Sequence, residues 1–241
     1  MKKNGGKKKR IRWDHIVIWL ITIVLTALLV WILLSLIPTD EIDVDSLLDE
    51  SSEVVFETES ETEKNIVPKP KIDKQHLTVN EFSRPGEKTD QIRFVVIHYL
   101  ANPQTSAQQN HDYFESLKND IDHVYMSANY IVGLEGEIIE CVPPGEIAYA
   151  SNSANHESVS IENCHLDESG RFTEETYSSC VHLTAWLVSK YGLGRENIIR
   201  HYDVTGKECP LYYVENEDKW EAFRDDVMNY IEECRKAESD G

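Results

Sequence analysis

Residues 92–99 read IRFVVIHY, an apolar run that is rich in β-branched and aromatic side chains. A run of this kind is typical of a strand that is buried on both faces of a sheet. His98 stands where the expected strand ends and a loop begins. Because open α/β sheets place their ligands at the carboxyl ends of strands, His98 is expected to face a cleft.

Strand and helix patterns alternate after this run. Ser106–Asp120 fits a helix with apolar contacts at Ala107, Tyr113, Phe114 and Leu117, and residues 128–143 fit a hairpin that turns at Leu134–Glu137. Further strands are expected at 157–164 and 197–201, a helix between an N-cap at Thr173 and a stop at Gly192, and a last helix along Trp220–Cys234. The pattern predicts a mixed α/β fold, with a mixed central sheet flanked by helices.

The N-terminal part of the chain predicts a membrane anchor. Residues 1–12 carry seven Lys and Arg residues and no acidic residue, and Ile16–Ile37 contains no charged residue at all. About 20 apolar residues suffice for a helix to span a bilayer. The run is too long for the apolar part of a signal peptide and has no small-x-small cleavage site after it, and no polar face marks it as a core helix. We expect a cytoplasmic basic tail at 1–14 and a transmembrane helix at 15–37, with the rest of the chain outside the cell membrane.

An acidic stretch follows the apolar run. Residues 38–75 begin with many Asp, Glu, Ser and Thr residues and end in VPKPKIDK. Such a composition buries too little apolar surface to offset the entropy of ordering, so it predicts a disordered linker. The folded domain is therefore expected over residues 76–236.

The net charge and the number of cysteines limit the possible partners and the possible disulfide pairings. The formal net charge is -19, which argues against nucleic acid as a partner. The chain has five cysteines, an odd number for a domain outside the membrane. If Cys209 binds a metal, four remain (Cys141, Cys164, Cys180 and Cys234), and the sequence leaves their pairing open, as it does the oligomeric state.

The stretch RHYDVTGKECP, Arg200–Pro210, brings a histidine and a cysteine close together in a segment that Gly206 and Pro210 mark as a loop. Imidazole and thiolate are both good zinc ligands. The alternative is a surface His201 and a buried, inert Cys209. A catalytic zinc site needs a third protein ligand, and His98 is the best placed of the other histidines.

Glu162 ends the run SVSIE, in which Ser158, Ser160 and Glu162 share one face of the expected strand. Carboxylates are rarely buried in a sheet unless they are paired or used in chemistry. Glu162 is thus either a functional group or a strand residue that faces solvent.

Four segments, 94–103, 127–143, 158–165 and 198–210, resemble in order the zinc-dependent N-acetylmuramoyl-L-alanine amidases of the type 2 family. That family is related to a phage lysozyme-amidase and to the peptidoglycan recognition proteins, and the resemblance covers about residues 78–225. It implies a peptidoglycan recognition protein-like fold and zinc as the cofactor. It also implies that His98, His201 and Cys209 bind the zinc, that Glu162 is the general base, and that Lys207 stabilises the transition state.

The resemblance has one departure. Many members have a histidine where this chain has Asn129, and the phage enzyme has a tyrosine in the place of Ala128. The roles of that histidine and that tyrosine are either vacant here or met by another group. Glu162 is the first candidate for them, and His123 and Tyr125 follow.

The resemblance implies hydrolysis of the amide bond between N-acetylmuramic acid and L-alanine in peptidoglycan. Two other functions stay open: a module that recognises muropeptides without cutting them, and a structural anchor that holds a partner. The implied ligand set argues against both, because neither needs a metal site with an open position.

Overall fold

The computed structural model describes residues 65–119 and 123–239, together with Thr26 and Leu28. The expected basic tail, the expected transmembrane helix apart from those two residues, and most of the expected linker lie outside the described residues. Within the part of the chain that the structure describes, no helix has the length and apolar character needed to cross a membrane.

Six strands form one mixed sheet in the order β1-β4-β3-β5-β2-β6. Their bounds are β1 Asp73–Lys74, β2 Phe94–Ile97, β3 Tyr130–Val132, β4 Ile138–Glu140, β5 Ser158–Asn163 and β6 Ile198–Arg200. The β3–β4 pair is antiparallel, and every other neighbouring pair is parallel. The mixed α/β architecture expected from the sequence is confirmed.

Strand β2 lies inside the sheet, between β5 and β6. Val95, Val96 and Ile97 have no exposed surface, so the strand is buried on both faces. This burial confirms the central strand that the apolar run predicted.

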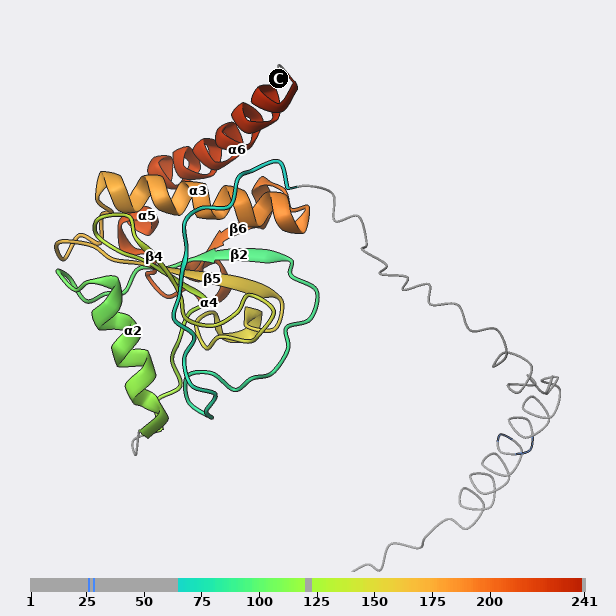
Figure 1. The fold of residues 1–241 in the computed structure, drawn as a ribbon, viewed down its shortest axis with the longest axis vertical. Coiled ribbons are helices and arrows are strands. Elements are labelled where there is room, and N and C mark those ends of the chain that lie inside the picture. The colour runs from blue at the N-terminus through green and yellow to red at the C-terminus, as the bar shows by residue number, and fades with distance from the viewer. Residues whose placement is uncertain (1–25, 27, 29–64, 120–122, 240–241) are drawn as a thin grey trace, which may run out of the picture. The chain divides into compact units, whose positions relative to one another are not determined.

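Helices cover both faces of the sheet (Figure 1). On one face α3 (Glu174–Tyr191) and α6 (Glu217–Ser239) pack over the cluster that contains Val95, Ile97 and Ile161. On the other face α2 (Ala107–Ser116) packs near Ile131 and Ile139. The shorter helical segments are the 3-10 turns η2 Leu117–Asn119, η3 Asn152–Ala154 and η4 Arg195–Asn197, and the helices α4 His201–Thr205 and α5 Leu211–Glu215.

The ends of α3 agree with their sequence signals. The Thr173 side chain accepts a hydrogen bond from the backbone N–H of Thr176, which satisfies one of the free donors of the first turn. Gly192 ends the helix with φ 62, a left-handed conformation that costs glycine little.

The buried face of α2 differs from the expected one. Ala107, Asn110, His111 and Phe114 are buried, whereas Tyr113 is 47% exposed. The helix is turned so that this i, i+3, i+4, i+7 stripe faces the sheet, and Tyr113 lies outside the stripe. His111 is tolerated inside because its Nε2 lies 2.8 Å from the Gln75 carbonyl oxygen.

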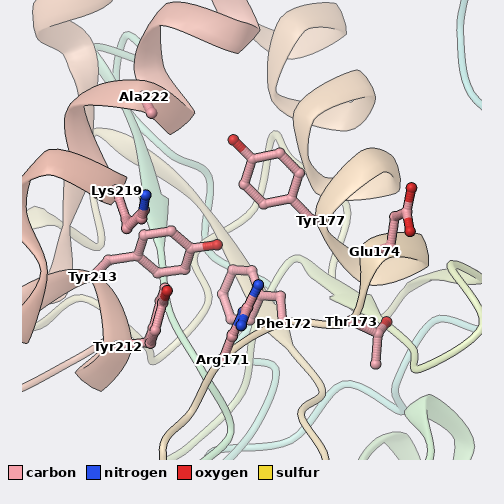
Figure 2. A pocket seen from close by; sticks show the side chains of 9 residues that line it. All are labelled: Arg171, Phe172, Thr173, Glu174, Tyr177, Tyr212, Tyr213, Lys219 and Ala222. Carbon is pink, nitrogen blue, oxygen red and sulfur yellow. The ribbon is translucent and has the colours of Figure 1, made fainter.

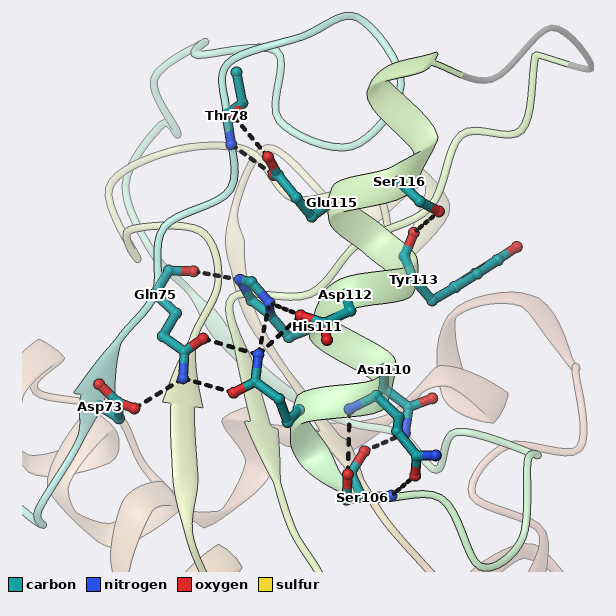
Figure 3. Close-up of polar contacts among 12 residues, drawn as sticks. Asp73, Gln75, Thr78, Ser106, Asn110, His111, Asp112, Tyr113, Glu115 and Ser116 are labelled. Atoms are coloured by element: carbon teal, nitrogen blue, oxygen red, sulfur yellow. Dashed lines mark hydrogen bonds and ion pairs between the residues drawn. The ribbon is translucent and has the colours of Figure 1, made fainter.

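The domain begins earlier than the expected residue 76. Val67 is only 1% exposed and belongs to the main core. Strand β1, which lies within the segment assigned to the linker, pairs with β4. The following residues bind α2: Gln75 forms a hydrogen bond with Gln108. Figure 3 shows a second contact, in which Thr78 donates its N–H and its hydroxyl to Glu115. The segment folds because it carries apolar side chains and lacks the acidic crowding of the stretch before it.

Candidate active site

Three neighbouring parallel strands bring the predicted site residues to one edge of the sheet. Glu162 lies in β5, His98 follows β2 directly, and His201 follows β6 directly. Since β5, β2 and β6 are adjacent and parallel, their carboxyl ends meet at the same edge. Residues that are distant in the sequence therefore converge here, where open α/β sheets bind ligands.

His98, His201 and Cys209 form a buried group that could hold a metal ion, with one ligand atom from each residue within 4.8 Å of the others. Nδ1 of His98 lies 3.7 Å from Sγ of Cys209, and the two imidazole rings are 4.9 Å apart between centroids. The structure thus brings together the three residues that the sequence singled out as ligands.

The segment that carries His201 and Cys209 is not a loop throughout. Residues His201–Thr205 form the short helix α4, which ends at Gly206 with φ 78. The chain then turns back, and the N–H of Tyr202 donates to the carbonyl oxygen of Cys209 at 2.9 Å. This bond closes the segment on itself and places the cysteine beside the histidine that begins the helix.

The ionisation of the three groups suits a metal site. Burial lowers the pKa of His98 well below its ordinary value, and the neighbouring His201 and Lys207 add to this effect. Burial and Lys207 also lower the pKa of His201, so both rings are neutral at pH 7. Burial, together with Glu162, raises the pKa of the Cys209 thiol to about 12, so a metal must displace its proton. Two imidazole nitrogens and one sulfur are a donor set that fits zinc and leaves a fourth position open.

Glu162 is not a strand residue that faces solvent. Its side chain is 15% exposed, and Oε1 lies 4.0 Å from Nδ1 of His98. Its other oxygen, Oε2, is buried with no hydrogen-bond partner among the described residues. Burial raises the pKa of Glu162 to about 8, although Lys207 acts in the opposite direction. With this pKa the group is largely protonated at pH 7 in the metal-free protein, and a cation held by the neighbouring ligands would favour its ionised form. In that form the unused oxygen is suited to accept a proton from water.

A cleft of about 330 Å³ opens over this group. Glu162, His201 and Lys207 lie in its lining. One part of the wall is aromatic and aliphatic, and consists of Tyr99, Leu100, Phe114, Tyr125, Met126 and Tyr149. The cleft therefore offers a cation and a carboxylate at one place and apolar contact surface at another.

Two residues of the site carried no recognisable signal in the sequence. Ser151 Oγ lies 3.1 Å from Nε2 of His98, and Asn152 Oδ1 lies 2.8 Å from Nε2 of His201. Small polar residues before a strand are common, so only the position of the turn beside both histidines reveals them.

The positions that depart from the family pattern have structural roles. The Asn129 side chain accepts from the N–H and the hydroxyl of Ser160 and donates toward nearby carbonyl oxygens, which ties β5 to the loop after β4. Ala128 is fully buried in the core on the α2 side. Of the two alternatives, Tyr125 lines the cleft and donates to Glu81, whereas His123 is exposed and packs beside Phe82.

The five cysteines are all free thiols. Cys141, Cys164 and Cys180 are buried in the two cores, and Cys234 is partly exposed on α6. The question of pairing that the sequence left open is thus answered: none of them forms a disulfide in the structure.

A second pocket, of about 360 Å³, lies between the start of α3, helix α5 and the start of α6 (Figure 2). It is lined by Arg171, Phe172, Thr173, Glu174, Tyr177, Tyr212, Tyr213, Lys219 and Ala222. None of the residues predicted for the active site takes part in it.

Known proteins share both the sequence pattern and the fold. Residues 88–211 match the family model described as N-acetylmuramoyl-L-alanine amidase. N-acetylmuramoyl-L-alanine amidase CwlL of Bacillus licheniformis is 34% identical over 173 residues, which are 67% of this chain and 48% of that protein. The amidase BlyA of Bacillus subtilis is 31% identical, over 63% of this chain and 45% of its own length. The chain spans about half the length of these curated relatives.

Solved structures agree on the fold. The structure of PlyL aligns with a TM-score of 0.56 at 22% identity, and covers 66% of this chain and 97% of its own. The PlyG catalytic domain aligns with a TM-score of 0.57 at 22% identity, over 67% of this chain and 96% of its own. With a family model that matches more than half of its residues, the chain belongs to the N-acetylmuramoyl-L-alanine amidase family.

Proposed function

We propose that this chain hydrolyses the amide bond between N-acetylmuramic acid and L-alanine in peptidoglycan. The observation that carries the proposal is the buried group of His98, His201 and Cys209 beside Glu162, in a cleft of a domain that belongs to the amidase family. A module that only recognises muropeptides has no need for a buried carboxylate beside three metal ligands.

His98, His201 and Cys209 would hold zinc, which as a Lewis acid activates water at neutral pH. Glu162 takes the proton from the attacking water with its free oxygen and passes it to the leaving amino group of L-alanine. Lys207 lies in the cleft lining, where its ammonium group stabilises the negative charge that develops on the carbonyl oxygen. No serine or cysteine nucleophile is needed, because Cys209 serves as a ligand.

The test is to incubate purified protein with peptidoglycan, with and without a chelator, and to measure new amino termini of L-alanine. We expect L-alanine termini to appear, to stop with the chelator and to return when zinc is added. Binding to peptidoglycan without any new termini would indicate the recognition module instead.

We also propose that residues 15–37 anchor the chain in the cell membrane, with the domain outside. Support comes from the uncharged run Ile16–Ile37 and from the basic residues that precede it. Fractionation of cells should find the full-length chain in the membrane, and protease added to wall-free cells should remove the domain. A shortened soluble form that starts near residue 38 would indicate a cleaved signal peptide.

A further inference from the structure

His98 and His201 each contact a residue of the short turn at 151–154 through the Nε2 atom of the ring. Ser151 Oγ lies 3.1 Å from Nε2 of His98, and Asn152 Oδ1 lies 2.8 Å from Nε2 of His201. Nδ1 of His98 lies on the other side of its ring, 3.7 Å from the Cys209 sulfur. The turn therefore contacts each ring at Nε2 and leaves Nδ1 for the metal.

The turn is itself held in place before any ligand arrives. The Asn155 side chain accepts hydrogen bonds from the backbone N–H of Ala150 and of Ser151, at 3.2 and 2.6 Å. The N–H of Ala154 donates to the carbonyl oxygen of Ser151 at 3.0 Å. Asn152 has φ 52, a left-handed conformation that asparagine adopts more readily than most residues. Ser151 is fully buried. The two side chains thus project from a fixed backbone.

The contact to Asn152 selects a tautomer. An amide oxygen can only accept a hydrogen bond, so His201 must carry its proton on Nε2. The lone pair of a neutral ring then lies on Nδ1, and only a lone pair can bind a metal. Ligating histidines usually donate their other N–H to such a partner, which fixes both tautomer and ring orientation.

We propose that Ser151 and Asn152 are positioning residues of the metal site, which hold both histidine rings at Nε2 so that both present Nδ1 to the metal, and that Asn152 also fixes the Nε2–H tautomer of His201. The inference rests on the proposed function only in that the site binds zinc. It concerns the affinity for the metal, and it can be tested without any turnover.

The first experiment measures zinc affinity of the full-length protein by competition with a chromogenic chelator. The variants are Ser151→Ala, Asn152→Gly and Asn152→Asp, with Ser153→Ala as the matched control. Glycine tolerates the left-handed backbone and removes the whole side chain, including the oxygen that contacts His201. Aspartate keeps an atom that can only accept. Ser153 is an exposed residue of the same turn that makes no side-chain hydrogen bond among the described residues.

We expect Ser151→Ala and Asn152→Gly each to weaken zinc binding by about 10- to 100-fold, the usual effect of losing such a partner. Asn152→Asp and Ser153→Ala should bind as the wild type does. The proposal is overturned if Asn152→Gly and Ser151→Ala bind zinc with the affinity of the wild type. It is also overturned if Asn152→Asp weakens zinc binding as much as Asn152→Gly does. If the wild type itself binds no zinc, the proposed function fails, and the second experiment still decides the positioning role.

The second experiment needs no metal. Nitrogen-15 spectra of the imidazole rings in the metal-free protein report which ring nitrogen carries the proton. We expect His201 in the wild type to be the pure Nε2–H form and in Asn152→Gly to be a mixture of both forms. A wild-type His201 protonated on Nδ1 would overturn the proposal. Melting temperatures of the metal-free variants identify any that fail to fold. If Asn152→Gly does not fold, Asn152→Ala, which also removes the side-chain oxygen, takes its place.

Discussion

His98 and His201 lie 4.9 Å apart between ring centroids, at the carboxyl ends of two strands that are direct neighbours in the sheet. Their approach follows from the parallel pairing of β2 with β6, since each histidine is the first residue after its strand. The sheet, not the local sequence, sets the distance between them.

Cys209→Ser should weaken zinc binding strongly, because a neutral hydroxyl replaces a soft, anionic ligand. Metal content after dialysis, measured by mass spectrometry, checks this. Cys234→Ser is the control, since Cys234 lies on α6 and outside the metal group. Full retention of zinc and activity by Cys209→Ser would remove Cys209 from the site.

Glu162→Gln should lower kcat by about 10²- to 10⁴-fold, because glutamine keeps the shape of the side chain and cannot accept the proton. Zinc should stay bound, as Glu162 is not a proposed ligand. The measurement is the rate of release of L-alanine termini, with Glu135→Gln, in the exposed hairpin turn, as the control. A rate near that of the wild type would place the base elsewhere, and Tyr125 in the cleft wall would be tested next.

Lys207→Ala should lower kcat by about 10²-fold or more, the usual effect of losing one group that stabilises the oxyanion. The affinity for zinc should be unchanged. Lys219→Ala, in the second pocket, is the matched control. Equal losses in the two variants would argue against a specific role for Lys207 and would make the second pocket part of the reaction.

Glu115 should make folding sensitive to acid. Partial burial acts to raise the pKa of Glu115, but hydrogen bonds from Lys118 and Thr78 outweigh it and lower the pKa to about 2. The folded pKa is thus below the unfolded one, so the contribution to stability is complete above pH 4.5 and is lost as the pH falls toward 2. The melting temperature of the wild type should fall more steeply over this range than that of Glu115→Gln. Parallel curves would show that the contacts of ionised Glu115 with Lys118 and with Thr78, the latter drawn in Figure 3, add no stability.

Val67→Ala should lower the free energy of unfolding by about 2 kcal/mol, the expected cost of removing two buried methyl-sized groups and leaving a cavity. Urea unfolding measures the change. Val79→Ala is the control, because Val79 is 59% exposed and should cost almost nothing. If the two variants are equally stable, residues near Val67 do not belong to the folded core.

The sequence predicted most of the strands and helices in which apolar residues recur at the regular spacing of that element. Strand β2 and helix α3 were readable because an apolar run and a capped amphipathic pattern each depend on nearby residues. The buried face of α2 was only partly readable: Ala107 and Phe114 are buried as expected, but Tyr113 is exposed and His111 is buried instead. The partner of His111, the Gln75 carbonyl oxygen, comes from a distant segment that local periodicity does not reveal.

The predicted site residues came partly from position and partly from resemblance. His98 could be placed from the end of its strand, whereas the closeness of His201 and Cys209 depended on a backbone bond between Tyr202 and Cys209 that no spacing rule gives. Ser151 and Asn152 could not be found, since their importance lies in which atoms face them across the fold.

The separation of the metal group along the chain has a consequence for the order of assembly. His98 and Cys209 are 111 positions apart, so the unfolded chain has no site and must first close a long loop. Because parallel strands pair residues that are far apart in the sequence, that closure is slow. Any metal that binds the finished group adds its binding free energy to the folded state alone, through thermodynamic linkage. A metal bound at the active site would therefore stabilise the sheet topology that brings its ligands together.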